Sequence, residues 1–275
     1  MAGLGPRHAR VDRLRKLLRR RSVRAGERAF VLEGAKLIGE ALTAGAPVET
    51  VFVAPGGEDD PVVARAETAG VRVSRLAPGV LERVAGTVTP QPLLAVAPWC
   101  DVPLEVALEA TFVVVCVEVR DPGNAGTVLR SAEGAGAGAV VLCDGSVEAF
   151  NPKTVRASAG ALFHVPVIQG GAPDEVLDRL GASGLRHLGA VSSGGVPHTA
   201  TDLTEPVALV LGNEASGLPV ALADRLDERI TVPLVGRSES LNVGMAAAVL
   251  CFEVARQRGA TGSPPAPTVG DTGTP

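Results

Sequence analysis

The stretch TFVVVCVEV (residues 111–119) is an almost uninterrupted apolar run near the middle of the 275-residue chain. Runs this short and this rich in valine are typical of strands that are buried on both faces of a parallel sheet. Similar runs follow it, and amphipathic or alanine-rich segments that favour helices separate them. Residues 112–258 are therefore predicted to form an α/β domain with a mostly parallel, Rossmann-like sheet. The predicted strands are 139–144, 164–168, 186–191, 207–211 and 230–234, and the predicted helices are 125–137, 151–163, 173–184, 219–227 and 240–258.

The N-terminal part alternates strands and helices on a smaller scale. Residues 29–98 predict a small α/β domain, in which the helix after strand 29–33 ends at Gly45. Residues 1–28 predict a basic arm with a helix over 10–24. Three prolines in and around residues 99–111 favour a linker. Residues 259–275 lack apolar periodicity, so we expect a disordered tail.

Charge is distributed unevenly along the chain. Residues 7–28 carry a net charge of +8, so the rest of the chain carries −12 of the total of −4. A basic segment on an acidic body favours a polyanionic partner such as RNA, although an arginine-rich solvated helix would look the same. Only three of the 26 basic residues are lysines, so the arginine bias is global. The candidate RNA-binding residues are Arg15, Lys16, Arg19, Arg20, Arg21 and Arg156.

Other classes of protein are disfavoured by composition. No apolar run approaches the roughly 20 residues of a membrane span, and the basic N-terminus is not followed by the apolar stretch of a secretory signal. The four cysteines are widely spaced without a CxxC pair, which disfavours a metal site or a redox dithiol. We therefore expect a cytoplasmic protein with no metal and no membrane association.

Three polar loops follow predicted strands of the larger domain. Ligands of open parallel sheets bind beyond the carboxyl ends of the strands. The first loop and the helix after it hold Asn124, a candidate helix cap, and Arg130. The second holds Glu214 between Gly212 and Gly217, and the third is GRSESLN (residues 236–242). Taken alone, the first is better explained as an ordinary loop with a helix cap, and the second about equally well as a simple turn. Together the three loops predict a site at one edge of the sheet.

The order and spacing of these segments resemble a known family. NAGTVLRSA (124–132), LVLGNEASGLP (209–219) and ITVPLVGRSESLNVGMAAAVL (230–250) are similar to the three ordered motifs of the SpoU-type (TrmH-type) RNA 2′-O-methyltransferases of the SPOUT superfamily. NPKTVRASAGALFHVPV (151–167) also resembles a family segment, and residues 30–97 resemble the small RNA substrate-binding domain of many members. The resemblance implies a sheet whose C-terminal part is tied in a deep trefoil knot, and a homodimer.

The resemblance also assigns candidate site residues. The cofactor of the family is S-adenosylmethionine. The candidate cofactor-binding positions are Leu211, Gly212, Asn213, Gly217, Ile230, Val232, Leu234 and Leu241. The candidate catalytic residues are Asn124, Arg130, Glu214, Ser240 and Asn242. The family implies that Arg130 is the base. A guanidinium is normally protonated, so it more readily acts as a cation that contacts the 2′-oxygen and a neighbouring phosphate and stabilises the forming alkoxide.

Three functions remain open at this point. The first is methylation of a ribose 2′-hydroxyl, in ribosomal RNA (23S-type) or in transfer RNA. The small N-terminal domain favours ribosomal RNA. The second is a non-catalytic RNA-binding member of the fold, which the intact polar motif residues disfavour. The third is a nicotinamide-dependent dehydrogenase, which is disfavoured because no GxGxxG follows the strand at 112–119.

Overall fold

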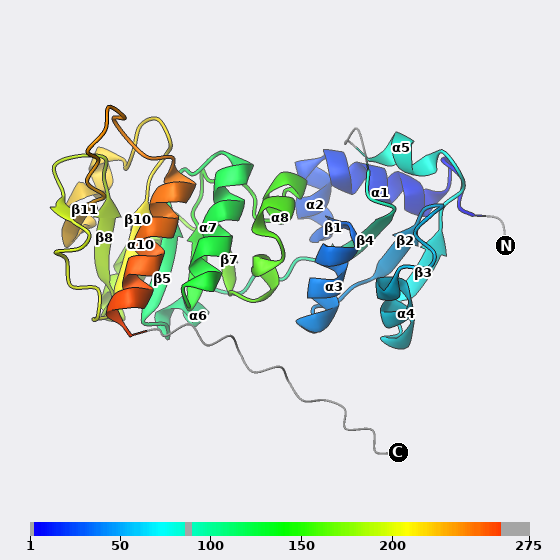
Figure 1. Ribbon diagram of the computed structural model, residues 1–275, viewed down its shortest axis with the longest axis horizontal. Helices are drawn as coiled ribbons and strands as arrows, with labels where there is room; N and C mark the ends of the chain where they lie inside the picture. Colours follow the sequence, from blue (N-terminus) through cyan, green and yellow to red (C-terminus); the bar gives the residue numbers. More distant parts are fainter. Residues whose placement is uncertain (1–2, 86–89, 260–275) are drawn as a thin grey trace, which may run out of the picture.

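The chain forms two α/β units side by side along the longest axis of the molecule (Figure 1). The computed structural model describes residues 3–85 and 90–259. The larger unit contains a seven-stranded sheet with the order β7-β6-β5-β10-β8-β11-β9, in which every neighbouring pair is parallel. Its strands are β5 (Phe112–Cys116), β6 (Ala139–Leu142), β7 (Val167–Gln169), β8 (Arg186–Ala190), β9 (Val196–Pro197), β10 (Val207–Leu211) and β11 (Glu228–Thr231). The predicted parallel sheet is confirmed.

Helices cover both faces of this sheet because consecutive side chains of a strand point to opposite faces. Val114 and Cys116 of β5 pack in a core with α7 (Pro122–Gly134) and α10 (Val243–Gln257), beside α8 (Pro152–Ser158). Val113 and Val115 pack on the other face with α6 (Glu105–Leu108), α9 (Pro173–Ala182) and the 3₁₀ helix η2 (Val220–Arg225). Burial on both faces explains why the central strands β5, β6 and β10 are apolar throughout.

The smaller unit holds a mixed sheet with the order β1-β4-β2-β3. Its strands are β1 (Ala29–Glu33), β2 (Thr50–Val53), β3 (Arg72–Arg75) and β4 (Leu93–Pro98). Strand β4 runs antiparallel to β1 and β2, whereas β2 and β3 are parallel. Helices α3 (Ala35–Thr43) and α4 (Pro61–Thr68) pack on one face, and α1 (Ala9–Arg19) and α5 (Val80–Val84) pack on the other.

Two segments outside the predicted domains are part of the packed structure. Within the predicted basic arm 1–28, the described residues 3–28 are not separate from the small unit, because Val11, Leu14 and Leu17 of α1 are fully buried against the small sheet. Helix α2 (Arg21–Glu27) follows α1 directly. The expected linker 99–111 is also packed: it contains α6, and Val102 N donates to Val167 O at 2.8 Å. In segments this short, the sequence alone does not distinguish a packed amphipathic helix from a solvated helix or a linker.

Two predicted helices differ from the observed elements. Residues 151–163 form α8 and then the 3₁₀ helix η1 (Ala161–Phe163), because Ala159 and Gly160 adopt positive φ angles of 53° and 103° and end α8. The helix predicted over 219–227 is the 3₁₀ helix η2, which covers only Val220–Arg225. The predicted tail lies outside the described residues, apart from Gly259, and the trefoil knot stays a prediction. Within the described ranges, no helix has both the length and the apolar character to cross a membrane.

Candidate active site

The carboxylate of Glu214 joins the loop after β10 to the loop after β5. Glu214 Oε1 accepts hydrogen bonds from Asp121 N (3.1 Å) and from Asn124 Nδ2 (3.0 Å). Its other oxygen lies 3.4 Å from Arg120 N. Both loops leave the carboxyl ends of adjacent parallel strands, so the sheet itself brings them together.

The third polar loop joins this network through a pair of side-chain amides. Asn242 Nδ2 donates to Asn124 Oδ1 at 2.8 Å, and Asn242 Oδ1 accepts from Gly244 N and Met245 N at the start of α10. Asn124 is not the helix cap that we expected. Asp121 caps α7 by accepting from Asn124 N at 2.9 Å, so that the Asn124 side chain is free to link Glu214 and Asn242. The predicted convergence of the three loops is confirmed.

Hydrogen bonding lowers the pKa of the Glu214 carboxyl. Partial burial raises the pKa of its carboxyl, but the hydrogen bonds from Asn124 and from the backbone outweigh burial, so the pKa lies below its ordinary value. Glu214 is therefore a carboxylate at neutral pH. An anion at this position holds the start of α7 against the loop after β10.

Asn213 organises the loop that carries Glu214. Its Oδ1 accepts from Ala215 N and Ser216 N at 3.0 and 3.1 Å, and its backbone pairs with Gly217 in both directions at 3.0 Å. A Cβ at Gly212 would lie 2.4 Å from the carbonyl carbon of Gly217, and Gly217 itself has a φ of 68°. Both glycines are required by the loop's own geometry.

Asn213 also stabilises an unusual backbone conformation after β5. Glu118 has a φ of 54°, a left-handed conformation that is costly for a residue with a Cβ. Its carbonyl oxygen accepts from Asn213 Nδ2 at 2.9 Å. The side chain of Asn213 therefore holds the turn that leads from β5 toward α7.

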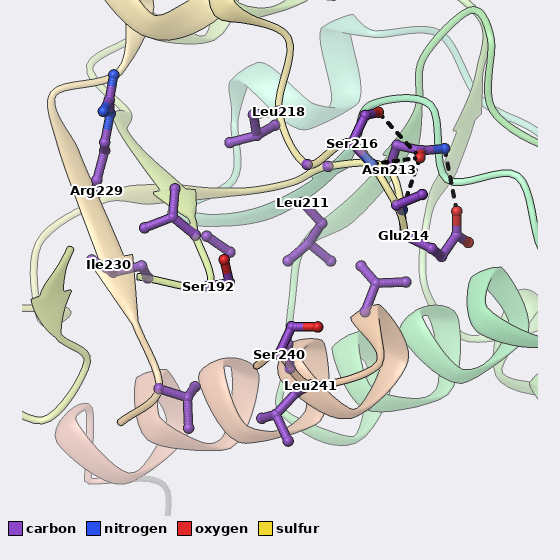
Figure 2. Close-up of a pocket in the computed structure, with 18 of the residues that line it drawn as sticks. Ser192, Leu211, Asn213, Glu214, Ser216, Leu218, Arg229, Ile230, Ser240 and Leu241 are labelled. Atoms are coloured by element: carbon purple, nitrogen blue, oxygen red, sulfur yellow. Dashed lines mark hydrogen bonds between the residues drawn. The ribbon is translucent and has the colours of Figure 1, made fainter. Parts of the chain in front are cut away.

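A cavity of about 420 Å³ opens beside this network, beyond the carboxyl ends of β8, β10 and β11. Figure 2 shows Glu214 and Asn213 on one side of it, Arg229 on the other, and Ser240 and Leu241 near the start of α10. All eight candidate cofactor-binding residues line it, together with Glu214 and Ser240 from the catalytic set: Leu211, Gly212, Asn213, Gly217, Ile230, Val232, Leu234 and Leu241. The volume lies within the usual range for small-molecule sites, about 300–1,000 Å³.

One wall of the cavity was missed by the sequence reasoning. Ala190, at the end of β8, and Val191 and Ser192, in the loop after it, line the cavity. The sequence signal is weak, because SSGG (192–195) has no distinctive motif. Only the sheet order, with β8 between β10 and β11, places this loop at the site. Arg229 and Leu218 also line the cavity and were likewise not predicted.

Several predicted residues are not part of the hydrogen-bonded network. Arg130 is exposed on α7 and makes no hydrogen bond or ion pair within residues 3–85 and 90–259. Arg15 and Lys16 both pair with Asp12, and Arg156 pairs with Glu33 at 2.9 Å. The other three candidate RNA-binding residues, Arg19, Arg20 and Arg21, are exposed.

Within residues 3–85 and 90–259, the cysteines and acidic residues show no metal-type arrangement. Burial raises the pKa of the Cys143 and Cys251 thiols to about 12, and it raises the pKa of Cys116 further still. These buried cysteines are therefore neutral thiols, which behave as small apolar side chains. In the part of the chain that the structure describes, no group of three His, Cys, Asp or Glu side chains could hold a metal ion.

Fold and site together define an α/β protein with a small-molecule cavity at the carboxyl edge of a parallel sheet and an amide–carboxylate network beside it. Residues 111–252 match the SpoU rRNA methylase family, and residues 8–95 match the MRM3-like substrate-binding domain. The chain belongs to the SpoU rRNA methylase family.

Curated relatives match over nearly the whole chain. The 23S rRNA (guanosine(2553)-2′-O)-methyltransferase RlmP of Bacillus subtilis is 36% identical over 87% of this chain and 93% of its own. The 23S rRNA (uridine(2479)-2′-O)-methyltransferase of Streptomyces viridochromogenes is 30% identical over 92% of this chain and 91% of its own.

Solved structures agree with this assignment. The SpoU methyltransferase AviRb from Streptomyces viridochromogenes, in complex with AdoMet, superposes with a TM-score of 0.82 at 29% identity and covers 94% of this chain and 100% of its own. An AdoMet-bound rRNA methyltransferase from Sinorhizobium meliloti superposes with a TM-score of 0.82 at 28% identity and covers 93% of this chain and 97% of its own.

Proposed function

We propose that this chain transfers a methyl group from S-adenosylmethionine to a ribose 2′-hydroxyl of ribosomal RNA, of the 23S type. The observation that carries the proposal is the hydrogen-bonded set Asn124–Glu214–Asn242 beside a ligand-sized cavity. The relatives that are named as 23S rRNA 2′-O-methyltransferases support the substrate class.

The cavity fits S-adenosylmethionine in size and in chemistry. The side chains of Leu211, Leu218 and Ile230 provide apolar walls for an adenine, and the Asn213–Gly217 loop provides backbone groups for the polar parts. Val232, Leu234 and Leu241 would hold the ligand from the third loop. When bound, the cofactor supplies an electrophilic methyl group on a sulfonium, which is a good leaving group.

Each catalytic candidate has a role that follows from its contacts. Glu214 fixes the first turn of α7 and orients Asn124, and Asn124 in turn orients Asn242. These two amides position the ribose. Arg130 has no intramolecular partner among the described residues, so its guanidinium is available to the 2′-oxygen and to a neighbouring phosphate. Ser240 lines the cavity and is placed to contact the ribose.

The protein acts as a homodimer in this proposal. Met245, Val249 and Phe252 of α10 are exposed and follow each other at helical spacing, so they form one apolar stripe. An exposed apolar helix face of this kind fits a second copy of the chain. The four free cysteines fit a reducing cytoplasm, where we place the protein.

Labelled methyl transfer tests the proposed function directly. The protein is incubated with methyl-labelled S-adenosylmethionine and either unmodified 23S ribosomal RNA or unmodified transfer RNA, and ribose methylation is then mapped. Label in one ribose of the ribosomal RNA is the expected result. Label only in transfer RNA would show that the substrate is transfer RNA and not ribosomal RNA. RNA binding without label in either RNA would overturn the proposal in favour of a non-catalytic RNA-binding protein.

A further inference from the structure

The candidate RNA-binding cations divide into two groups in the structure. Arg15 and Lys16 share an ion pair with the single carboxylate of Asp12, and Arg156 pairs with Glu33. Arg19, Arg20 and Arg21 remain exposed, and they lie where α1 ends and α2 begins. This corner of the small unit faces the large unit, and Figure 1 shows α2 directly beside α8.

A buried ion pair fixes α2 to the large unit. Arg24 is 3% exposed, and its Nε and Nη2 donate to the two carboxylate oxygens of Glu148 at 2.6 and 3.1 Å. Arg24 Nη1 also donates to Leu17 O at 2.8 Å. Arg21 Nε lies 3.8 Å from the same carboxylate, yet the Arg21 side chain is 74% exposed. Arg24 thus neutralises Glu148 and leaves Arg21 at the contact with its charge open to solvent.

A lysine that the sequence reasoning did not select lies across this contact. The turn after Glu148 begins α8: Asn151 N donates to Glu148 O at 3.0 Å, and Asn151 Oδ1 accepts from Lys153 N at 2.9 Å. Lys153 is exposed, and no carboxylate of the described residues pairs with it. We call the contact between α2 and residues 144–153 the seam.

The seam leads directly to the catalytic network. Helix α8 packs tightly on the first turns of α7, because a Cβ at Gly126 would lie 2.4 Å from Ala157 Cβ and 2.8 Å from Thr154 O. Lys153 precedes Thr154, and Asn124 lies two residues before Gly126. Exposed cations therefore lie on both sides of the seam. Helix α8, which carries Lys153, packs against the first turns of α7, which carry Asn124 of the amide pair.

We propose that Arg20, Arg21 and Lys153 form a phosphate track, on which the backbone of the RNA crosses the seam on its way to the catalytic network. The inference rests on the proposed RNA substrate. Arg20 and Lys153 have no ion-pair partner among the described residues, and Arg21 contacts only the Glu148 carboxylate that Arg24 already neutralises. Phosphate can therefore bind these cations without displacing a strong ion pair, and each such contact releases a counterion. Because the units are joined by Arg24–Glu148 and by the rings of Phe30 and Phe150 (5.0 Å apart), the distance from track to network is fixed.

Two variants with the same change in charge test the track. Arg21→Gln/Lys153→Gln removes two track cations. Arg72→Gln/Arg75→Gln removes two exposed cations from β3, the outer strand of the small sheet on the side opposite β1. Binding to in vitro-transcribed 23S ribosomal RNA is measured by fluorescence anisotropy over a series of salt concentrations. S-adenosylmethionine affinity, measured by calorimetry, and thermal unfolding show that each variant is folded.

The track variant is expected to bind the RNA about tenfold more weakly than the control, with a log–log salt slope that is smaller in magnitude by about 1.4 to 1.8. Equal RNA affinities of the two variants overturn the track, whether both affinities stay at the wild-type value or both fall by the same factor. The proposed function has a separate readout. Track-dependent binding without methyl transfer by the wild-type protein overturns the function and keeps the track. Methyl transfer that is unaffected in the track variant overturns the track and keeps the function.

Discussion

Asn242 makes two kinds of contact at the start of α10. Its side-chain oxygen caps the helix by accepting from Gly244 N at 2.9 Å, and its amide nitrogen donates to Asn124 Oδ1 at 2.8 Å. A helix cap needs only the oxygen, so a serine or aspartate would serve equally well for that purpose. An amide is required at this position because its oxygen must accept from the backbone at the start of α10 while its nitrogen donates to Asn124 across the site.

Asn242→Ser and Asn242→Ala separate the two contacts. Serine keeps a capping oxygen but does not reach Asn124, so the variant should unfold near the wild-type temperature and lose methyl transfer about a hundredfold. Alanine loses both contacts and should also be destabilised by about 1 kcal/mol. Urea unfolding and initial rates of methyl transfer measure the two effects. Wild-type activity in Asn242→Ser would show that the amide pair does not position the substrate.

A single substitution also tests the catalytic role of Arg130. It is exposed and without an intramolecular partner in the described chain, so Arg130→Ala should leave unfolding and cofactor affinity unchanged. Loss of a cation that stabilises a forming alkoxide should lower kcat about a hundredfold to a thousandfold. Single-turnover methylation and calorimetry with S-adenosylmethionine provide the measurements. Near-normal methylation with intact cofactor binding would exclude both roles, base and electrostatic stabiliser.

At the scale of elements, the site depends on where strands and helices end. Helix α7 begins at Pro122 with Asp121 as its cap, three residues earlier than predicted, and this places Asn124 in the first turn with its side chain free. Asp, Pro and Asn all favour helix starts, so the sequence alone does not decide which of them is the cap.

The C-terminal part of α10 contains a carboxylate that should make stability depend on pH. Glu253 accepts from Arg256 Nε and Nη2 at 2.8 and 2.6 Å and from Gln257 Nε2 at 2.8 Å. These bonds, chiefly the one with Arg256, lower the pKa of Glu253 from 4.5 to about 2. A depressed pKa stabilises the folded state above pH 4.5, and the stabilisation is lost as pH falls from 4.5 toward 2.

Glu253→Gln should therefore be less stable than the wild-type protein at pH 7 and closer to it at pH 3. Urea unfolding at both pH values gives the comparison. Asp174→Asn, at an exposed carboxylate in the first turn of α9, provides a control. An equal difference between Glu253→Gln and the wild-type protein at the two pH values would contradict the assigned contribution of Glu253.

At the scale of the whole molecule, one apolar core runs through both units. It contains Phe30 and Leu32 of the small sheet, Phe112 and Val114 of the large sheet, and Phe150 between them. Trp99 stacks on Phe150 with ring centroids 4.7 Å apart. The expected linker is thus part of a rigid joint, and the small unit has a fixed orientation toward the active site.

The proposed homodimer is tested on the apolar stripe of α10. Phe252 is 53% exposed, and Phe252→Glu would place a charge in the interface and should weaken the dimer by roughly a hundredfold. Ala64→Glu, at an exposed position of α4, is the matched control. Sedimentation velocity over a range of concentrations gives the dissociation constants. An unchanged dimer in Phe252→Glu would place the interface elsewhere, and a monomeric wild-type protein would refute the homodimer.

The sequence by itself determined the parallel α/β unit and the three polar loops, and the resemblance of its motifs to the family proposed eight cofactor positions, all of which line the cavity. These features depend on local hydrophobic periodicity and on motifs that are continuous in the chain. The tertiary structure alone decided the order of the strands, and with it the contribution of the β8 loop to the cavity. It also decided which arginines are free and which are paired, because the fold brings Glu148 to Arg24 and Glu33 to Arg156 from more than a hundred residues away, whereas Arg130 has no partner among the described residues. Partners far apart in the chain leave no local pattern, so their pairing emerges only when the chain is packed.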